Sequence, residues 1–368
     1  MGKHEEIRSE SVDIYSSAKK VKKAKRKKKK TSVGKRVAIV ILSVFICIML
    51  VATGGLIFLM NYFDYNKTEV DLGALGVNSE DSEDHIVNIA LFGIDTRNTA
   101  SMKGLSDSIM ILSVNKETKQ LKLISVMRDS VVMVDGKAAK INSAYSKGGA
   151  ELAIRTLNEN FGLDITDYAT VNFVGMAELI DVVGGIDAEV TQAEINDSLH
   201  GVNYQILEQS NMLGIEPEYV KNPGLQTLNG IQAVSWARIR YQPTAAGERD
   251  DYGRTARQRH VINQLFQKAK EMSLFEYPKF IKTMIPYVET SLDEKEIVSL
   301  AYAVIKGGTL NSTRIPYDNC LIGGNGGVAG GVYYNLDFAS ELIKSYVYDD
   351  VTFDAYIEAN GIDKTHWR

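Results

Sequence analysis

The sequence predicts an α/β protein, with a mixed central β-sheet flanked by helices on both faces (an α/β/α sandwich) and an N-terminal transmembrane anchor. Two observations carry this prediction. After residue 86, apolar strand-like segments alternate with helical patterns, which is typical of a sheet covered by helices. Before it, the stretch from Val37 to Phe63 contains no charged residue. About 20 apolar residues are enough to span a bilayer.

The charges beside this apolar stretch set its orientation. Twelve lysines and arginines lie between Lys19 and Arg36, and basic flanks stay in the cytoplasm. We therefore expect four regions: a basic cytoplasmic tail (1–36), a transmembrane helix (37–63), an acidic linker (64–85) and an extracytoplasmic domain (86–368). The expected location is the cell membrane, with a single pass and the N-terminus inside.

The uneven charge also limits the classes of partner. Residues 1–36 hold 14 basic and 4 acidic side chains, whereas the rest of the chain holds 28 basic and 42 acidic ones. A basic run can bind nucleic acid. Beside a transmembrane helix, however, it is expected from topology and from attraction to anionic lipids. We therefore expect a membrane partner and no nucleic-acid partner.

The domain can be divided into strands and helices from its apolar patterns. Five apolar runs predict buried strands: Ile86–Asp95, Ser108–Val114, Leu121–Met127, Tyr168–Phe173 and Ile186–Val190. The polar residues 115–120 predict a hairpin between the second and third of them. Helical patterns cover residues 148–160, 176–183, 228–237, 254–272, 277–288 and 293–306.

Polar clusters interrupt these elements, mostly at strand ends, where α/β sheets usually hold ligands. The first strand closes with Gly93-Ile-Asp95-Thr-Arg97, and the second opens with Ser106-Asp107-Ser108. The third strand closes with Arg128-Asp129. The fourth cluster is Arg238-Ile-Arg240, followed by Asp251-Tyr-Gly-Arg254-Thr-Ala-Arg257-Gln258.

These residue types suit a pyrophosphate–metal site. Strand-end aspartates can ligate Mg²⁺, which usually takes one or two carboxylates together with substrate phosphate and water. The planar guanidinium of arginine donates pairs of hydrogen bonds to phosphate. Arg254, Arg257 and Gln258 share a face of a helix, and Arg254 is expected at the helix N-terminus, which favours anions. Taken singly, each cluster also suits a turn, a helix cap or a solvated face. The five histidines show no zinc-ligand spacing.

The order of these motifs resembles the LytR–CpsA–Psr family. The ordered set is Gly-x-Asp-x-Arg, Ser-Asp-Ser, Arg-Asp-Ser, Ile141-Asn-Ser-Ala-Tyr145, Val183-Gly-Gly-Ile-Asp187, Leu228-Asn-Gly230 and the arginine-rich fourth cluster. The resemblance covers residues 87–265 closely. This chain departs from the family at two places: Lys103-Gly-Leu-Ser106 lacks an arginine before Ser-Asp, and Met127 replaces a proline.

The resemblance implies a transferase. Family members move anionic glycopolymers, of the teichoic acid or capsular polysaccharide type, from undecaprenyl pyrophosphate onto peptidoglycan through a phosphodiester link. By resemblance, Asp95 and Asp107 would bind Mg²⁺, with Mn²⁺ as the alternative. The pyrophosphate would be held by Arg128, Arg238, Arg240, Arg254, Arg257 and Gln258, with support from Arg97, Asp129 and Asp251. Arg128, Asp107 and Arg254 are the expected catalytic residues.

Two other functions stay open from the residues. A membrane-tethered pyrophosphatase or phosphatase would use the same site with water as acceptor. A non-enzymatic surface or regulatory binding protein would need no such site. The group that deprotonates the acceptor hydroxyl is also open, with Asp107 and Asp129 as candidates.

Overall fold

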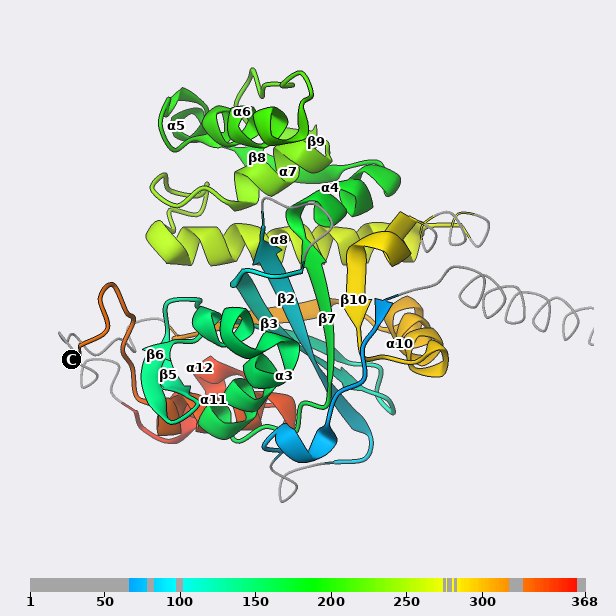
Figure 1. Ribbon diagram of the computed structural model, residues 1–368, viewed down its shortest axis with the longest axis vertical. Helices are drawn as coiled ribbons and strands as arrows, with labels where there is room; N and C mark the ends of the chain where they lie inside the picture. The colour runs from blue at the N-terminus through cyan, green and yellow to red at the C-terminus, as the bar shows by residue number, and fades with distance from the viewer. Residues whose placement is uncertain are drawn as a thin grey trace, which may run out of the picture. The chain divides into compact units, whose positions relative to one another are not determined.

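A seven-stranded mixed β-sheet forms the centre of the computed structural model (Figure 1). The structure describes residues 66–77, 83–96, 102–273, 276, 280, 283–317 and 327–362. The strands lie in the order β1-β10-β7-β2-β3-β4-β11. The β2–β3–β4 meander is antiparallel, β7 pairs parallel with β2, and β11 pairs parallel with β4. This confirms the predicted mixed sheet and the hairpin between the second and third predicted strands.

The sheet and two small hairpins contain the strands β1 (Asn66–Lys67), β2 (Ile86–Asp95), β3 (Leu105–Asn115), β4 (Leu121–Val126), β5 (Val131–Val134), β6 (Lys137–Lys140), β7 (Asp167–Asn172), β8 (Ile186–Val190), β9 (Gly224–Leu228), β10 (Val288–Thr290) and β11 (Leu310–Ile315). The α-helices are α3 (Asn142–Phe161), α4 (Phe173–Val182), α5 (Gln192–Asn196), α6 (Val202–Leu213), α7 (Gly230–Ala237), α8 (Asp250–Glu271), α10 (Glu294–Lys306), α11 (Leu336–Val347) and α12 (Phe353–Ala359). The 3₁₀ turns are η1 (Leu72–Ala74) and η2 (Ile285–Tyr287).

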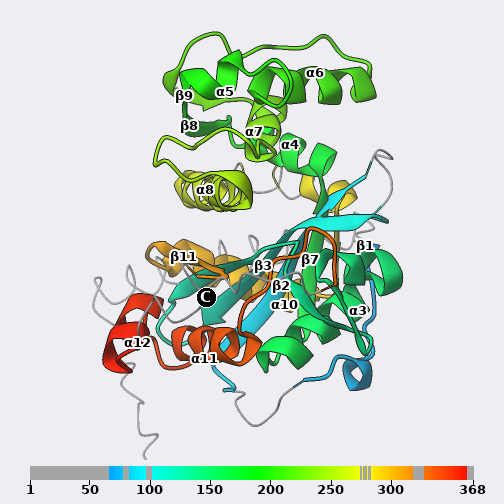
Figure 2. The same cartoon turned by 90° about the vertical axis from the view of Figure 1, so that its left-hand side faces the viewer.

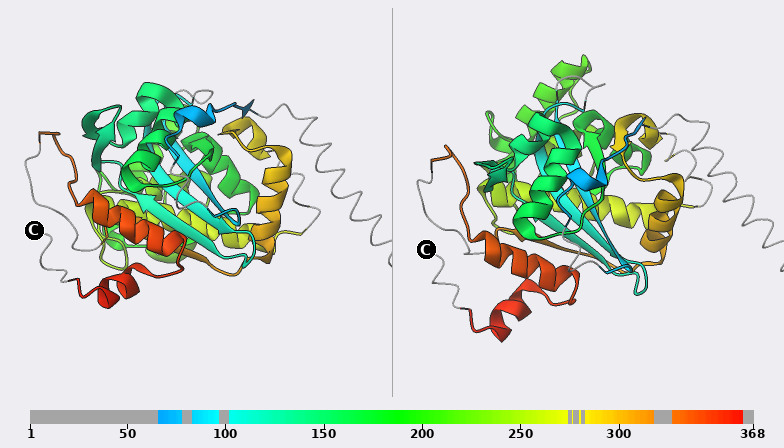
Figure 3. Two further views of the ribbon diagram at one scale, coloured as in Figure 1. Left: turned by 90° about the horizontal axis from the view of Figure 1, so that it is seen from below. Right: turned by 60° about the horizontal axis from the view of Figure 1, so that its bottom comes forward.

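Helices cover both faces of the sheet. Figure 2 shows α3 and α11 on one face and α8 on the other. Seen from below in Figure 3, the strands run between α11 and α12 on one side and α10 on the other. All six residues of β4 are buried, as expected for a strand with helices on both faces. The arrangement is therefore the predicted α/β/α sandwich.

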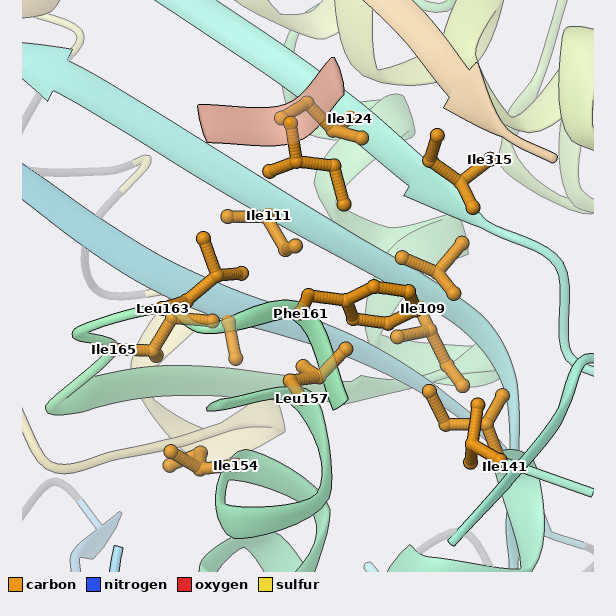
Figure 4. Close-up of a cluster of buried hydrophobic side chains, with 14 of the residues drawn as sticks. Ile109, Ile111, Ile124, Ile141, Ile154, Leu157, Phe161, Leu163, Ile165 and Ile315 are labelled. Atoms are coloured by element: carbon orange, nitrogen blue, oxygen red, sulfur yellow. The ribbon is translucent and has the colours of Figure 1, made fainter. Parts of the chain in front are cut away.

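The main core lies between the sheet and α3. Ile109, Ile111 and Ile124 of the sheet pack near Leu157 and Phe161 of α3 (Figure 4). Leu157 and Phe161 are both fully buried, so truncating either to alanine would cost about 2–5 kcal/mol. The helix ends at Gly162, whose φ of 62° is a left-handed conformation suited to glycine.

A second core builds a lobe beyond α8. It contains α4 to α7 and the β8–β9 hairpin, which Figure 1 shows together at one end of the molecule. Capping boxes begin two of its helices, with Thr191 and Glu194 on α5 and Asn229 and Gln232 on α7. Val261 of α8 belongs to this core, so α8 lies between the lobe and the sheet.

Several predicted boundaries are wrong. Helix α3 begins at Asn142, because Gly148-Gly149 forms a kink inside the helix rather than its start. Val288, expected to end a helix, instead begins β10. Part of the expected acidic linker belongs to the domain, since β1 pairs with β10 and Leu75 is fully buried.

The predicted tail (1–36) and transmembrane helix (37–63) lie outside the described residues. Within the described ranges, no helix combines the length and the apolar character needed to cross a bilayer.

Candidate active site

The two predicted metal ligands lie at the loop end of the β2–β3 hairpin, where β2 ends and β3 begins. Gly93 pairs with Ser108, but the next residue of β2, Ile94, pairs with Ser106. Asp107 is therefore an extra residue in β3, a β-bulge, which re-aims a side chain. An added Cβ on Gly93 would lie 2.9 Å from the Cβ of Ser108, so the close strand approach requires glycine here. Asp95 and Asp107 both line a polar pocket of about 240 Å³.

Arg128 follows β4 and reaches the same pocket. Its Nη1 donates a hydrogen bond to Oδ2 of Asp107 at 2.6 Å. Burial lowers the pKa of Arg128, but the charge and hydrogen bond of Asp107 outweigh it and raise the pKa above its usual value. The buried Nε of Arg128 has no hydrogen-bond partner among the described residues. Arg128 is thus a fixed cation on the pocket wall.

Asp129 supports this arginine from behind and does not line the pocket. Its Oδ1 lies 2.9 Å from Nζ of Lys140, and its Oδ2 lies 3.6 Å from Nε of Arg128. Burial raises the pKa of Asp129, but hydrogen bonding to Lys140 and the charge of Arg128 outweigh it and lower the pKa below its usual value. Asp129 therefore stays ionised and is a weak base.

Two arginines reach the pocket from the end of α7. Nη2 of Arg238 lies 3.5 Å from Oδ2 of Asp95, and its guanidinium stacks on Phe173 at 4.6 Å from the ring centre. Nη2 of Arg240 donates to Oδ2 of Asp251 at 2.9 Å. The segment after α7 therefore brings two cations to the pocket that Asp95 and Asp107 also line.

Helix α8 provides the remaining wall. It begins at Asp250, four residues before the predicted start, so Arg254 lies in its second turn and not at its N-terminus. Asp251 joins two arginines, because its Oδ1 lies 2.7 Å from Nη2 of Arg254 and its Oδ2 accepts from Arg240. Burial, with the nearby charge of Arg128, lowers the pKa of Arg254. Its Nε also has no hydrogen-bond partner in the described part of the chain.

The structure does not bring Arg257 to this pocket, so its predicted role as a pyrophosphate ligand is wrong. Arg257 and Glu194 are both fully buried as an ion pair of 2.6 Å. Nη1 and Nη2 of Arg257 also donate to the carbonyl oxygens of Ile239 and Gln242. Arg254 and Gln258 are four residues apart on α8, and both line the pocket. Arg257 precedes Gln258, and successive residues of a helix point about 100° apart, so its side chain leaves in another direction.

Other pocket residues gave no signal in the sequence. Phe173, His200, Gln205 and Tyr241 line the pocket, and none of them belongs to a polar cluster at a strand end. They lie on the lobe, whose packing against the sheet brings them close to the arginines. Arg97, predicted as a supporting residue, lies outside the described residues.

An apolar pocket of about 230 Å³ adjoins the polar one. Both are lined by Phe173, Arg238 and Gln258. The apolar walls come from β2, β3, β7, β10, α4, α7 and α8, and include Leu91, Met110, Leu179, Val261 and Val288. A ligand with its charged group in the polar pocket could therefore place an apolar tail in the apolar pocket, between the sheet and the lobe.

The acidic residues fit a metal that is partly ligated by its substrate. The described residues contain no group of three or more His, Cys, Asp or Glu side chains suited to hold a metal alone. Asp95 and Asp107 are each paired to an arginine through Oδ2. Two carboxylates plus phosphate oxygens and water are a usual Mg²⁺ ligand set.

The profile of the LytR_cpsA_psr family matches residues 59–340. The chain belongs to this family, as the motif order predicted. Biofilm regulatory protein A of Streptococcus mutans is 29% identical over 332 residues, covering 85% of this chain and 75% of that protein. The polyisoprenyl-teichoic acid–peptidoglycan teichoic acid transferase TagU of Enterococcus faecalis is 29% identical, covering 74% of this chain and 84% of TagU.

A solved member of the family shares the fold. The structure of TagT (YwtF) with bound octaprenyl pyrophosphate lipid superposes with a TM-score of 0.51 at 20% identity, covering 77% of this chain and 93% of TagT. The mixed α/β fold described above is thus the fold of the family.

Proposed function

We propose that the protein transfers an anionic glycopolymer, of the teichoic acid or capsular polysaccharide type, from a polyprenyl pyrophosphate carrier to peptidoglycan. The observation that carries this proposal is the junction of the two pockets. A pocket lined by four arginines shares wall residues with an apolar cavity. A lipid-linked pyrophosphate is the kind of molecule that needs both. TagU is named a teichoic acid transferase, and TagT was solved with octaprenyl pyrophosphate lipid bound, so both support this proposal.

The residues suggest how the donor is held. Arg128 and Arg254 would bind the pyrophosphate oxygens with their guanidinium groups, and Arg238 and Arg240 would close the opposite side of the pocket. Phe173 and Gln258, shared by both pockets, would lie where the pyrophosphate joins the tail. The apolar pocket would hold the part of the tail nearest the pyrophosphate.

Transfer needs positioning and charge neutralisation more than covalent groups. An acceptor hydroxyl attacks the phosphorus next to the glycopolymer, and polyprenyl phosphate leaves with the bonding electron pair. The arginines stabilise the charge that develops on the phosphate oxygens. Bound Mg²⁺, or Mn²⁺, would supply further charge neutralisation at Asp95 and Asp107. A single N-terminal membrane anchor, with the domain outside the cytoplasm, would bring the enzyme to its lipid-linked donor and to peptidoglycan.

A transfer assay separates this function from its alternatives. Full-length protein is given a labelled glycopolymer on polyprenyl pyrophosphate, together with peptidoglycan. A transferase makes covalently linked label, a pyrophosphatase or phosphatase releases free polymer phosphate, and a binding protein makes neither. We expect the linked product.

The metal ligands can be tested by binding as well as by activity. Asp95→Asn and Asp107→Asn should weaken Mn²⁺ binding in the presence of pyrophosphate, followed by the electron paramagnetic resonance of the metal. Asp71→Asn, a carboxylate that caps η1 away from the pocket, is the control. Unchanged Mn²⁺ binding in both pocket variants would remove the metal from the proposal.

A further inference from the structure

The proposed transfer needs a group that takes the proton of the acceptor hydroxyl, and the two aspartates considered from the sequence fit this role poorly. Asp107 is held by Arg128 at 2.6 Å and is a proposed metal ligand. Asp129 lies behind Arg128 and outside the pocket, and its lowered pKa makes it a weak base. The base must therefore be sought elsewhere on the pocket wall.

The lobe supplies an imidazole at this wall. His200 lies between α5 and α6 and lines the polar pocket together with the arginines. Its side chain is 50% exposed, so an incoming sugar can reach it. The ring packs edge-on against Tyr241, with 4.6 Å between ring centres, and the side chain of Tyr241 is also largely exposed. Gln205 of α6 adds an amide to the same wall.

A carboxylate lies beside this imidazole. Oδ1 of Asp197 lies 3.8 Å from Nδ1 of His200. Asp197 is itself fixed, since Oδ1 accepts from the backbone amides of Leu199 and His200 and Oδ2 accepts from Gln242. Burial raises the pKa of Asp197, but these hydrogen bonds outweigh it and lower the pKa. Asp197 therefore stays ionised and favours the tautomer with the proton on Nδ1, which leaves Nε2 to accept a proton.

We propose that His200 is the general base of the transfer, with Asp197 as its positioning residue and Tyr241 and Gln205 as contacts for the acceptor glycan. This assignment rests on the proposed transferase function. Nε2 of His200 takes the proton of the acceptor hydroxyl while its oxygen bonds to the phosphorus next to the glycopolymer. The bond from that phosphorus to the bridging oxygen breaks, and polyprenyl phosphate leaves with the electron pair.

Charged groups on several elements face His200 across the pocket. They are Asp95 on β2, Asp107 on β3, Arg128 after β4, Arg238 and Arg240 after α7, and Arg254 on α8. Tyr241 and Asp197 contact the ring directly. Because several of these groups can affect a pH profile, the test must show which part of the profile disappears when the imidazole is removed.

The experiment uses full-length protein in detergent, a disaccharide–pyrophosphate–polyprenol donor and peptidoglycan glycan strands as acceptor. The rate constant kcat is measured from pH 5 to 9 for wild type, His200→Gln and the control His85→Gln, whose ring pairs with Glu83 at 2.9 Å and does not line the pocket. His200→Gln should lower kcat about 10²–10⁴-fold and remove the fall of kcat on the acid side. Donor affinity should not change, and added imidazole should partly restore His200→Ala. The control should behave as wild type.

Three results would overturn the assignment. A kcat for His200→Gln close to wild type would do so, and so would a lower kcat with an unchanged acid side of the profile. A loss of donor affinity in place of kcat would make His200 a donor contact instead of the base. If the wild type itself links no donor to peptidoglycan, the proposed function fails together with the base.

Discussion

Two arginines one helical turn apart on α8 have opposite surroundings. Arg254 lines the polar pocket, shares Asp251 with Arg240, and keeps an Nε without a hydrogen-bond partner among the described residues. Arg257 points away from the pocket into the core, where Glu194 and two backbone carbonyls accept from Nε, Nη1 and Nη2. Arg254 therefore keeps one buried donor without a partner in the described ranges, whereas Arg257 uses Nε, Nη1 and Nη2 in the core.

This difference separates a binding site from a structural pair. A buried donor without a partner has a free-energy cost that an anionic ligand would offset. A buried ion pair whose charges and donors are all matched has no group left to bind a ligand. Arg257 nevertheless acts on the site indirectly, because the carbonyls that it holds flank Arg240 and Tyr241 in the chain. Changes at Arg254 and at the pair of Arg257 and Glu194 should therefore affect different properties.

The largest expected effect is a loss of folding stability when the buried pair of Arg257 and Glu194 is broken. Glu194→Gln leaves the charge of Arg257 buried without its partner, and breaking such a pair costs about 3–5 kcal/mol. Urea unfolding measures the loss. Arg155→Gln is the control, because its pair with Asp135 is much more exposed and should contribute only about 0–1 kcal/mol. Equal losses in the two variants would contradict the account of this buried pair.

The next largest effect is a loss of transfer activity when Arg254 is changed. Arg254→Lys keeps the charge and removes the planar donor pair, so transfer should fall about 10²–10³-fold with nearly unchanged urea unfolding. Arg155→Lys serves as the matched control for an arginine-to-lysine change. If Arg254→Lys unfolds much more easily while the folded fraction transfers normally, Arg254 is structural like Arg257.

The smallest effect concerns Asp129, which supports the pocket without facing it. Its pKa is lowered in the folded state, so its stabilisation is complete above the unfolded value of about 3.9. It is lost as the pH falls through the folded value. Asp129→Asn should therefore cost roughly 1–3 kcal/mol near pH 7, and the difference from wild type should shrink below about pH 4. Urea unfolding across this range checks it, and a difference independent of pH would contradict it.

The sequence predicted the parts of the site that short-range patterns determine. Asp95, Asp107 and Arg128 follow or interrupt apolar strands, so the sheet alone brings them together. The wrong assignment of Arg257 came from treating residues 254, 257 and 258 as one helical face. Arg257 points away from the pocket because it pairs with Glu194, which is distant in sequence. His200 and Tyr241 could not be predicted for the same reason, since only the packing of the lobe brings them to the pocket.

The central claim is that the pocket face of α8 binds a pyrophosphate whose tail enters the apolar pocket. The direct test measures binding of octaprenyl pyrophosphate and of inorganic pyrophosphate to the full-length protein. Arg254→Lys should weaken both ligands. Val288→Trp, which fills the apolar pocket from β10, should weaken only octaprenyl pyrophosphate, by about tenfold or more for a loss of 1.4 kcal/mol. The claim is contradicted if Arg254→Lys binds both ligands as wild type does, or if Val288→Trp leaves octaprenyl pyrophosphate binding unchanged.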